Sequence, residues 1–233
     1  MQISTAELAK LIDLSAVKAE DDDAYLKSLV KSAIKYRCFA IYPLAARVPM
    51  VVELLKGNDD ILVGGAVGFP SGGETTQSKV FEAKELVYMG CKEIDMVINI
   101  GLLRSKRFKE VQQDIAAVVE ACGNIPVKVI LECHYLTEDE IMHGCDQIIA
   151  AKAKWVKTGT GWAPTGATLK NIALLKKHVG DELGVKAAGG IRDLNTLMQM
   201  YKLGASRFGL GLKSSTSILE EAWAVNDGIL HIN

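Results

Sequence analysis

The sequence predicts an α/β protein with the (β/α)8 fold, the TIM barrel, and three observations lead to this prediction. Short apolar runs alternate with helical patterns along the chain, which is typical of parallel strands joined by helices. Eight such runs occur at intervals of roughly 20 to 35 residues, the length of one strand–helix unit. Polar residues and glycines follow one run after another, as at the active-site end of a barrel. An open doubly wound sheet is the alternative, because periodicity counts strands but does not close them.

Eight strands are expected at the apolar runs. Strands of a parallel barrel are covered on both faces, so their sequence is nearly continuously apolar and often β-branched. The predicted strands are residues 11–14, 38–42, 61–67, 93–98, 127–131, 155–157, 185–188 and 207–210.

The segments between the strands carry helix signals. Gly123 follows a run of helically spaced apolar residues as a stop. Thr137 opens a capping-box pattern, and Asp193 is placed to cap a helix that Gly204 ends. No long linker, low-complexity tract or shift in composition marks a boundary. Residues 1–233 are therefore expected to form a single barrel domain.

Composition and charge disfavour several classes of function. The formal net charge is −1 and no basic block is present, which gives little electrostatic support for nucleic-acid binding. No segment approaches the roughly 18 uninterrupted apolar residues of a membrane span, and the N-terminus lacks a signal-peptide pattern. We therefore expect a soluble, cytoplasmic protein that binds neither nucleic acid nor a membrane.

The five cysteines form an odd, scattered set, as expected for free thiols in a reducing compartment. The nearest approach to a metal cluster is Cys133-His134, followed by His143 and Cys145. A helix that begins after Thr137 would carry the last two residues away from the end of the preceding strand. Packing is therefore the favoured interpretation of these residues, and no metal site is expected.

Two lysines, Lys157 and Lys186, stand at the C-terminal ends of apolar runs, where a buried charge is costly. On neighbouring strands of a barrel, both amines would point into one cavity at its mouth. Burial and the mutual repulsion of two ammonium groups then favour a neutral amine near pH 7, which is a nucleophile for carbonyl carbon. The alternative is that both side chains reach outward into solvent.

Two carboxylates are candidates for acid–base chemistry. Asp95 lies in an otherwise apolar run and needs a cation or hydrogen-bonded partners. We expect it to move protons beside the amine, with a structural ion pair as the alternative. Asp13 is expected at the end of the first strand, where it would orient the water lost from a carbinolamine. A helix cap or a strand-end hydrogen bond is an equally good interpretation of Asp13.

Glycines after the seventh and eighth predicted strands indicate an anion site. Gly189 and Gly190 precede a helix, and Gly209 and Gly211 are followed by Ser214. Barrels commonly bind a phosphate between these two loops, at backbone N–H groups and a helix N-terminus. A phosphorylated substrate is therefore expected.

Three stretches together resemble the signature motifs of the deoxyribose-phosphate aldolases, a family of class I aldolases with a (β/α)8 barrel. They are VKTGTG at residues 156–161, VKAAGGIR at residues 185–192 and EIDMVINIG at residues 93–101. The likeness extends in family order over nearly the whole chain and includes Ile12-Asp13.

The resemblance implies a role for each matching residue. Lys157 matches the Schiff-base lysine, and Lys186 matches the lysine that lowers its pKa. Asp95 matches the proton relay, and Asp13 matches an aspartate of the water network. The substrate and its phosphate are expected to contact Asp13, Thr158, Gly189, Gly190, Gly209, Gly211 and Ser214.

The implied reaction is the reversible cleavage of 2-deoxy-D-ribose 5-phosphate to acetaldehyde and D-glyceraldehyde 3-phosphate. The partners are thus a small sugar phosphate and an aldehyde. Neither a metal nor another cofactor is implied, because the iminium itself is the electron sink.

Three departures from the family pattern, Leu210, Leu212 and Trp162, leave a second enzyme open. It is a related lysine-dependent aldolase that acts on a different sugar phosphate. A sugar-phosphate-binding barrel without catalysis is a different class, but binding alone does not require two amines in one cavity. A metal-dependent aldolase is disfavoured by the weak His/Cys spacing. A homo-oligomer is compatible with the sequence, which does not fix the oligomeric state.

Overall fold

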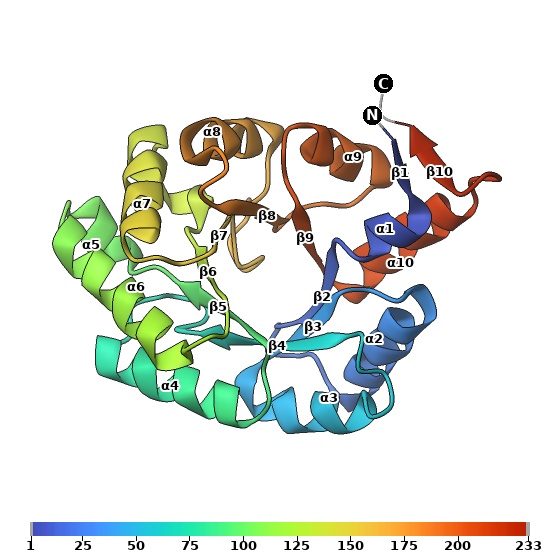
Figure 1. Ribbon diagram of the computed structural model, residues 1–233, viewed down its shortest axis with the longest axis horizontal. Helices are drawn as coiled ribbons and strands as arrows, with labels where there is room; N and C mark the ends of the chain where they lie inside the picture. The colour runs from blue at the N-terminus through green and yellow to red at the C-terminus, as the bar shows by residue number, and fades with distance from the viewer. Residues whose placement is uncertain (1, 232–233) are drawn as a thin grey trace.

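The computed structural model describes residues 2–231, and its centre is a closed barrel of eight strands (Figure 1). All neighbouring strands are parallel, and β9 pairs with β2 to close the ring. The barrel strands are β2 (Ile12–Ala16), β3 (Ala40–Pro43), β4 (Leu62–Val67), β5 (Glu93–Val97), β6 (Val127–Ile130), β7 (Trp155–Lys157), β8 (Gly184–Ala188) and β9 (Arg207–Leu210). All eight predicted strands are confirmed, and the closed pairing excludes the open sheet.

A ring of helices surrounds the barrel and links successive strands (Figure 1). The helix after Thr137 has the expected capping box, and Asp193 caps the helix that ends before Gly204. The helices between or after barrel strands are α2 (Asp23–Tyr36), α3 (Val48–Leu54), α4 (Thr76–Tyr88), α5 (Ile100–Arg104), α6 (Phe108–Cys122), α7 (Glu138–Ala150), α8 (Leu169–Val179), α9 (Leu194–Lys202) and α10 (Leu212–Trp223), with short 3₁₀ helices η1 (Ala45–Arg47) and η2 (Cys133–Tyr135).

A small antiparallel ribbon lies outside the barrel and is not evident from the sequence. It pairs β1 (Gln2–Ser4) with β10 (Ile229–His231), beside α1 (Thr5–Ala9) (Figure 1). Three-residue strands show no usable periodicity, so only the tertiary pairing reveals them. The ribbon joins the two ends of the described chain.

The hydrophobic core lies between the barrel and the helices. Strand side chains such as Ile94 and Val129 are buried there with helix side chains such as Leu29 and Ile115. Because side chains alternate between the two faces of a strand, the intervening strand residues point into the barrel. Several of these inward residues are charged, and they form the candidate site. Within residues 2–231, no helix combines the length and apolarity needed to cross a membrane.

Candidate active site

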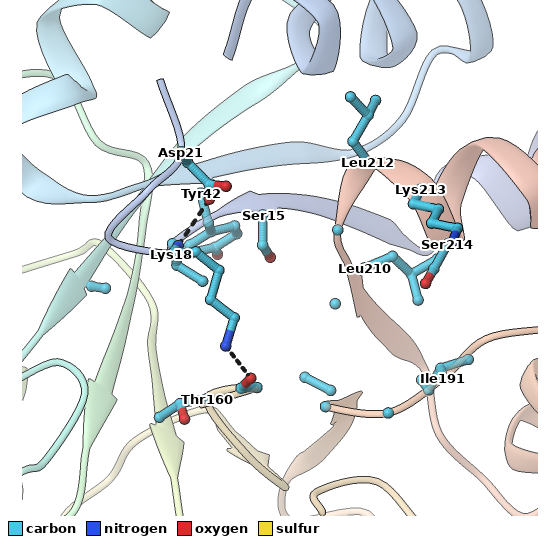
Figure 2. A pocket seen from close by; sticks show the side chains of 18 of the residues that line it. Ser15, Lys18, Asp21, Tyr42, Thr160, Ile191, Leu210, Leu212, Lys213 and Ser214 are labelled. Carbon is cyan, nitrogen blue, oxygen red and sulfur yellow. Dashed lines mark hydrogen bonds between the residues drawn. The ribbon is translucent and has the colours of Figure 1, made fainter. Parts of the chain in front are cut away.

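The C-terminal ends of the strands surround a cavity of about 620 Å³. Its walls come mainly from the segments after β2, β7, β8 and β9, and two charged strand residues, Lys157 and Asp95, lie at its base. Figure 2 shows the cavity between Lys18 on one side and Lys213 and Ser214 on the other. This is the end of the barrel at which the sequence predicts the active site.

Lys157 and Lys186 are brought together by the register of two neighbouring strands. β7 and β8 pair with Lys157 directly opposite Lys186, so both side chains point to the same face of the sheet. Both Nζ atoms donate hydrogen bonds to Oδ2 of Asp95, each at 2.8 Å. The prediction that the two amines share one buried site is confirmed by this geometry, and the outward alternative is wrong.

The two lysines differ in their carboxylate partners, and their pKa values shift in opposite directions. Burial lowers the pKa of Lys157 to about 8, with Asp95 opposing the shift and the positive charge of Lys186 reinforcing it. Burial also acts to lower the pKa of Lys186, but the attraction of Asp13 and Asp95 outweighs it and raises that pKa. Lys186 therefore keeps its charge while Lys157 can lose its proton near neutral pH.

Asp95 lies on β5 at the junction of three amines. Besides the two hydrogen bonds to Oδ2, its Oδ1 atom lies 3.5 Å from Nζ of Lys128. Burial alone would raise the pKa of Asp95, but Lys157, Lys186 and Lys128 together hold it well below its usual range. The carboxylate is thus ionised, and its Oδ2 atom lies within hydrogen-bond distance of the Lys157 amine.

Asp13 lies deeper than the sequence suggests. It is the second residue of β2, fully buried, and does not contribute to the cavity wall. Its Oδ2 atom lies 2.7 Å from Nζ of Lys186, and its Oδ1 atom accepts a hydrogen bond from Arg207 at 2.9 Å. Asp13 thus lies outside the cavity wall, not beside the substrate as the sequence predicts, and it is the buried counterion of Lys186.

A second group of charged residues lies below Asp95, and sequence reasoning missed it. Nζ of Lys128 lies 2.6 Å from Oε2 of Glu93 and donates a hydrogen bond to the hydroxyl of Tyr42 at 2.7 Å. Arg207 contributes Nη1 at 3.4 Å from the same Glu93 oxygen. A signal was present, because Lys128 interrupts an apolar strand run just as Asp95 does. These four residues are called the lower cluster below.

The loops after β8 and β9 form the predicted anion-binding side of the cavity. Gly189, Gly190, Gly209, Gly211 and Ser214 all contribute to the wall. Gly190 has a φ of +100°, and a Cβ atom there would meet open space. Gly211 is the N-cap of α10, so the first N–H groups of this helix lie at the cavity wall.

Two cations accompany this side of the cavity. Arg192 donates a hydrogen bond from Nη1 to Oγ of Ser214 at 3.3 Å, and Lys213 also contributes to the wall. Neither has an ion pair with a carboxylate within the described residues. This side of the cavity therefore favours the binding of an anion, because it combines the N-terminus of α10 and glycine backbone N–H groups with two positive charges.

Thr158 has a structural task that differs from the expected substrate contact. Its hydroxyl donates to the carbonyl oxygen of Ala188 at 2.7 Å and accepts from the N–H of the same residue at 2.9 Å. Thr158 is fully buried and does not belong to the cavity wall. It therefore ties the end of β7 to the end of β8.

The cysteine and histidine residues singled out in the sequence do not come together. His134 hydrogen-bonds to Thr165, whereas His143 packs its ring on Phe108. Cys133 and Cys145 are buried free thiols. Within residues 2–231, no group of three or more His, Cys, Asp or Glu side chains is arranged to hold a metal ion.

Comparison with known proteins gives a family match over most of the chain. The model of the DeoC/LacD family aldolases matches residues 8–211, which include every barrel strand. The deoxyribose-phosphate aldolase of Klebsiella pneumoniae is 40% identical over 95% of this chain and 90% of that protein. The deoxyribose-phosphate aldolase of Rhizobium meliloti is 39% identical over 99% of this chain and 93% of that protein.

Solved structures give the same result. A crystal structure from Coccidioides immitis, assigned as a deoxyribose-phosphate aldolase, has a TM-score of 0.90 and 33% identity. The similarity covers 96% of this chain and 88% of that one. A deoxyribose-phosphate aldolase from Aeropyrum pernix, described as a tetramer, has a TM-score of 0.86 and 24% identity, covering 95% of this chain and 93% of that one. At that identity, it is evidence for the fold alone.

Proposed function

This chain belongs to the DeoC/LacD family of aldolases, and we propose that it reversibly cleaves 2-deoxy-D-ribose 5-phosphate through a Schiff base on Lys157. The family resemblance that the motifs indicate is thus confirmed by full-length relatives. The products are acetaldehyde and D-glyceraldehyde 3-phosphate. The observation that carries the catalytic part of the proposal is the position of Lys157 at the base of an open cavity, where it shares the Asp95 carboxylate with the positively charged Lys186.

The reaction begins at Nζ of Lys157. The neutral amine attacks the C1 carbonyl carbon of the open-chain sugar, and the resulting carbinolamine loses water to give an iminium. Loss of the proton from the C3 hydroxyl breaks the C2–C3 bond, releases glyceraldehyde 3-phosphate and moves an electron pair into the iminium. The enamine then takes a proton at C2, and hydrolysis of the new iminium releases acetaldehyde.

Asp95 and Lys186 support these steps without bonding covalently to substrate. Asp95 is hydrogen-bonded to the reacting amine, so it can pass protons as the carbinolamine forms and loses water. Lys186 also donates a hydrogen bond to Oδ2 of Asp95, and its ion pair with Asp13 keeps it positively charged. Its charge opposes protonation of Lys157 and thereby keeps the nucleophile available.

The phosphate of the substrate is assigned to the N-terminus of α10 and the glycine loops. Backbone N–H groups near Gly190 and Gly211 can donate to it, and Ser214 and Arg192 lie on the same side of the cavity. This placement puts the sugar chain between the phosphate loops and Lys157.

The sequence is also compatible with a homo-oligomer. A native mass measurement of the protein tests this expectation.

Borohydride trapping tests the proposal. Reduction of the protein with sodium borohydride in the presence of acetaldehyde should convert the iminium to an ethylated lysine, which peptide mass analysis should locate at Lys157. Lys157→Leu is the matched variant, and it should give no adduct. An adduct on Lys186 would reverse the two assigned roles. Absence of any adduct, with activity abolished by a chelator, would overturn the Schiff-base mechanism.

A further inference from the structure

Two loops are fastened together across the cavity mouth by reciprocal contacts. Nζ of Lys18, after β2, donates to the carbonyl oxygen of Gly161 at 2.6 Å. Nε1 of Trp162, after β7, donates back to the carbonyl oxygen of Val17 at 2.8 Å. The same ammonium group lies 5.2 Å from the centroid of the Trp162 ring, within cation–π range. Because β8 and β9 stand between β7 and β2 in the ring, the two linked loops lie on either side of the phosphate loops.

The ring of Trp162 is itself held in place. Its backbone N–H donates to the Thr160 hydroxyl at 2.9 Å, and that hydroxyl is bound to Glu132. Phe69, from the loop after β4, meets the ring edge-on with the ring centroids 6.2 Å apart. Trp162 does not contribute to the cavity wall, whereas Lys18 does. The tryptophan therefore acts on the cavity through the lysine that it positions.

The ammonium group of Lys18 attracts the nearby carboxylate of Asp21 but is not fixed to it in an ion pair. Within residues 2–231 it makes no ion pair with a carboxylate. Its partners are one carbonyl oxygen and one aromatic ring, so donors of the ammonium group are left for another acceptor. Asp21 also borders the cavity, but its carboxylate is bound to the backbone N–H of Lys18 at 2.8 Å. A partly buried cation held in this way suits an anionic ligand.

Lys18 and the phosphate loops border the same cavity. In Figure 2 its side chain extends toward Thr160 and Gly161 on one wall, while Lys213 and Ser214 lie on the opposite wall. A phosphate at the N-terminus of α10 would thus have Arg192 and Lys213 on its own side and Lys18 on the other. Positive charge on both walls favours a dianion over a neutral sugar end.

We propose that Lys18 is a specificity-determining residue that recognises the phosphate end of the substrate, and that Trp162 is its positioning residue. The proposal rests on the proposed aldolase function for the identity of the substrate, but not for the binding of a phosphorylated ligand. Lys18 adds a positioned side-chain cation to the backbone donors of α10. Sugar phosphates are thereby selected over their dephosphorylated counterparts.

The first test measures binding without chemistry. Titration calorimetry with glycerol 3-phosphate, a ligand that has no carbonyl group, should give a dissociation constant at least about tenfold weaker for Lys18→Met than for the parent, as expected for loss of a charge-assisted hydrogen bond. Lys18→Arg keeps the charge and should recover most of the affinity. Lys27→Met removes an exposed lysine of α2 and is the matched control for net charge.

The second test measures selectivity during turnover. The ratio of kcat/KM for 2-deoxyribose 5-phosphate to that for 2-deoxyribose should fall by about tenfold in Lys18→Met and should be restored by Lys18→Arg. Trp162→Phe keeps a ring but loses the donor to Val17, and it should lower the ratio less. In the Lys18→Met background, Trp162→Phe should lower the ratio no further, because its effect runs through Lys18.

An unchanged ratio and an unchanged affinity for glycerol 3-phosphate in Lys18→Met would overturn the proposal, even if turnover of both sugars slowed equally. Equal slowing would show that the link between the two loops only closes the mouth. If the parent neither cleaves the sugar phosphate nor traps acetaldehyde, the proposed function fails on its own account. The calorimetric result for Lys18 then still decides the present proposal.

Discussion

The interior of the barrel has two halves built from the same kinds of side chain, yet only the upper half places charged groups at the cavity wall. In the lower cluster, Lys128 and Arg207 share the carboxylate of Glu93. In the upper half, Lys157 has Asp95 as its only carboxylate within ion-pair distance among the described residues, and it borders an open cavity. Lys186 stands between the two halves with two carboxylates.

Counting charges explains which amine gives up its proton. The connected network has the carboxylates of Asp13, Glu93 and Asp95, and the cations of Lys128, Lys157, Lys186 and Arg207. Three negative and four positive charges leave an excess of one positive charge. Loss of the proton from Lys157 balances the buried network, whereas loss from any fully paired cation would leave a carboxylate less well compensated. The comparison teaches that the number of carboxylate partners and the access to the cavity distinguish Lys157, the proposed nucleophile, from the other buried cations.

The largest expected effect comes from removing the reactive amine. Lys157→Leu fills the base of the cavity with an apolar side chain that cannot form an iminium. The value of kcat/KM for aldol cleavage should therefore fall by about four orders of magnitude or more. Asp95 keeps its hydrogen bond to Lys186, so the fold should persist. Single-turnover kinetics and circular dichroism check the two statements. Activity within tenfold of the parent would place the nucleophile elsewhere.

Removing a buried amine from the lower cluster should lower the free energy of unfolding more than it affects catalysis. Lys128→Met would leave Glu93 with Arg207 at 3.4 Å as its remaining cation and the Tyr42 hydroxyl without its donor. Removing one partner of a buried ion pair costs about 3–5 kcal/mol of the free energy of unfolding. Urea denaturation measures this loss, and borohydride trapping at Lys157 should continue in the folded protein. Loss of trapping at unchanged stability would show that the two halves are not separate in role.

The third prediction concerns Lys186, which lies between the two halves of the barrel interior. The neutral fraction of Lys157 rises as the pH increases through its pKa of about 8, so kcat/KM should rise over the same range. The charge of Lys186 lowers that pKa, so Lys186→Met should raise it and move the pH–rate profile toward alkaline pH, by about one pH unit. At pH 7 this shift alone costs about tenfold in rate.

Lys186→Arg is the control for this prediction, because it keeps the positive charge beside Asp13 and Asp95. Its pH–rate profile should stay near that of the parent even if turnover slows. A profile of Lys186→Met that coincides with the parent profile would contradict the role of Lys186 in tuning Lys157.

The barrel and its reactive centre could be predicted from the sequence because each rests on a local signal. Apolar runs locate the strands, and charged residues inside such runs, such as Lys157 and Asp95, mark positions where burial demands a partner. Lys128 carries the same signal. The depth of Asp13 cannot be predicted in the same way, because the apolar pattern does not show that β2 continues beyond Leu14 to Ala16.

The link between Lys18 and Trp162 could not be predicted, because it joins loops more than 140 residues apart through a carbonyl oxygen and a ring. Neither loop has a periodic pattern, and a carbonyl acceptor leaves no trace in the sequence. The pairing of β1 with β10 is hidden for the same reason. Contacts made by backbone groups of distant segments appear only once the barrel has placed those segments side by side.

The smallest expected effect concerns the phosphate side of the upper half, and it separates backbone strain from ligand contact. Gly190 and Gly123 both have positive φ, +100° and +59°, and at both a Cβ atom would meet open space. An alanine at either position would be held at a positive φ that L side chains rarely adopt, so each variant should lose on the order of 1–3 kcal/mol of the free energy of unfolding. Only Gly190 borders the cavity, so only there would the new methyl group occupy space near the ligand. Gly190→Ala should raise KM for 2-deoxyribose 5-phosphate several-fold and KM for 2-deoxyribose less, while Gly123→Ala should change neither. Equal changes in KM for the two sugars in Gly190→Ala would show that this glycine serves the turn and not the phosphate.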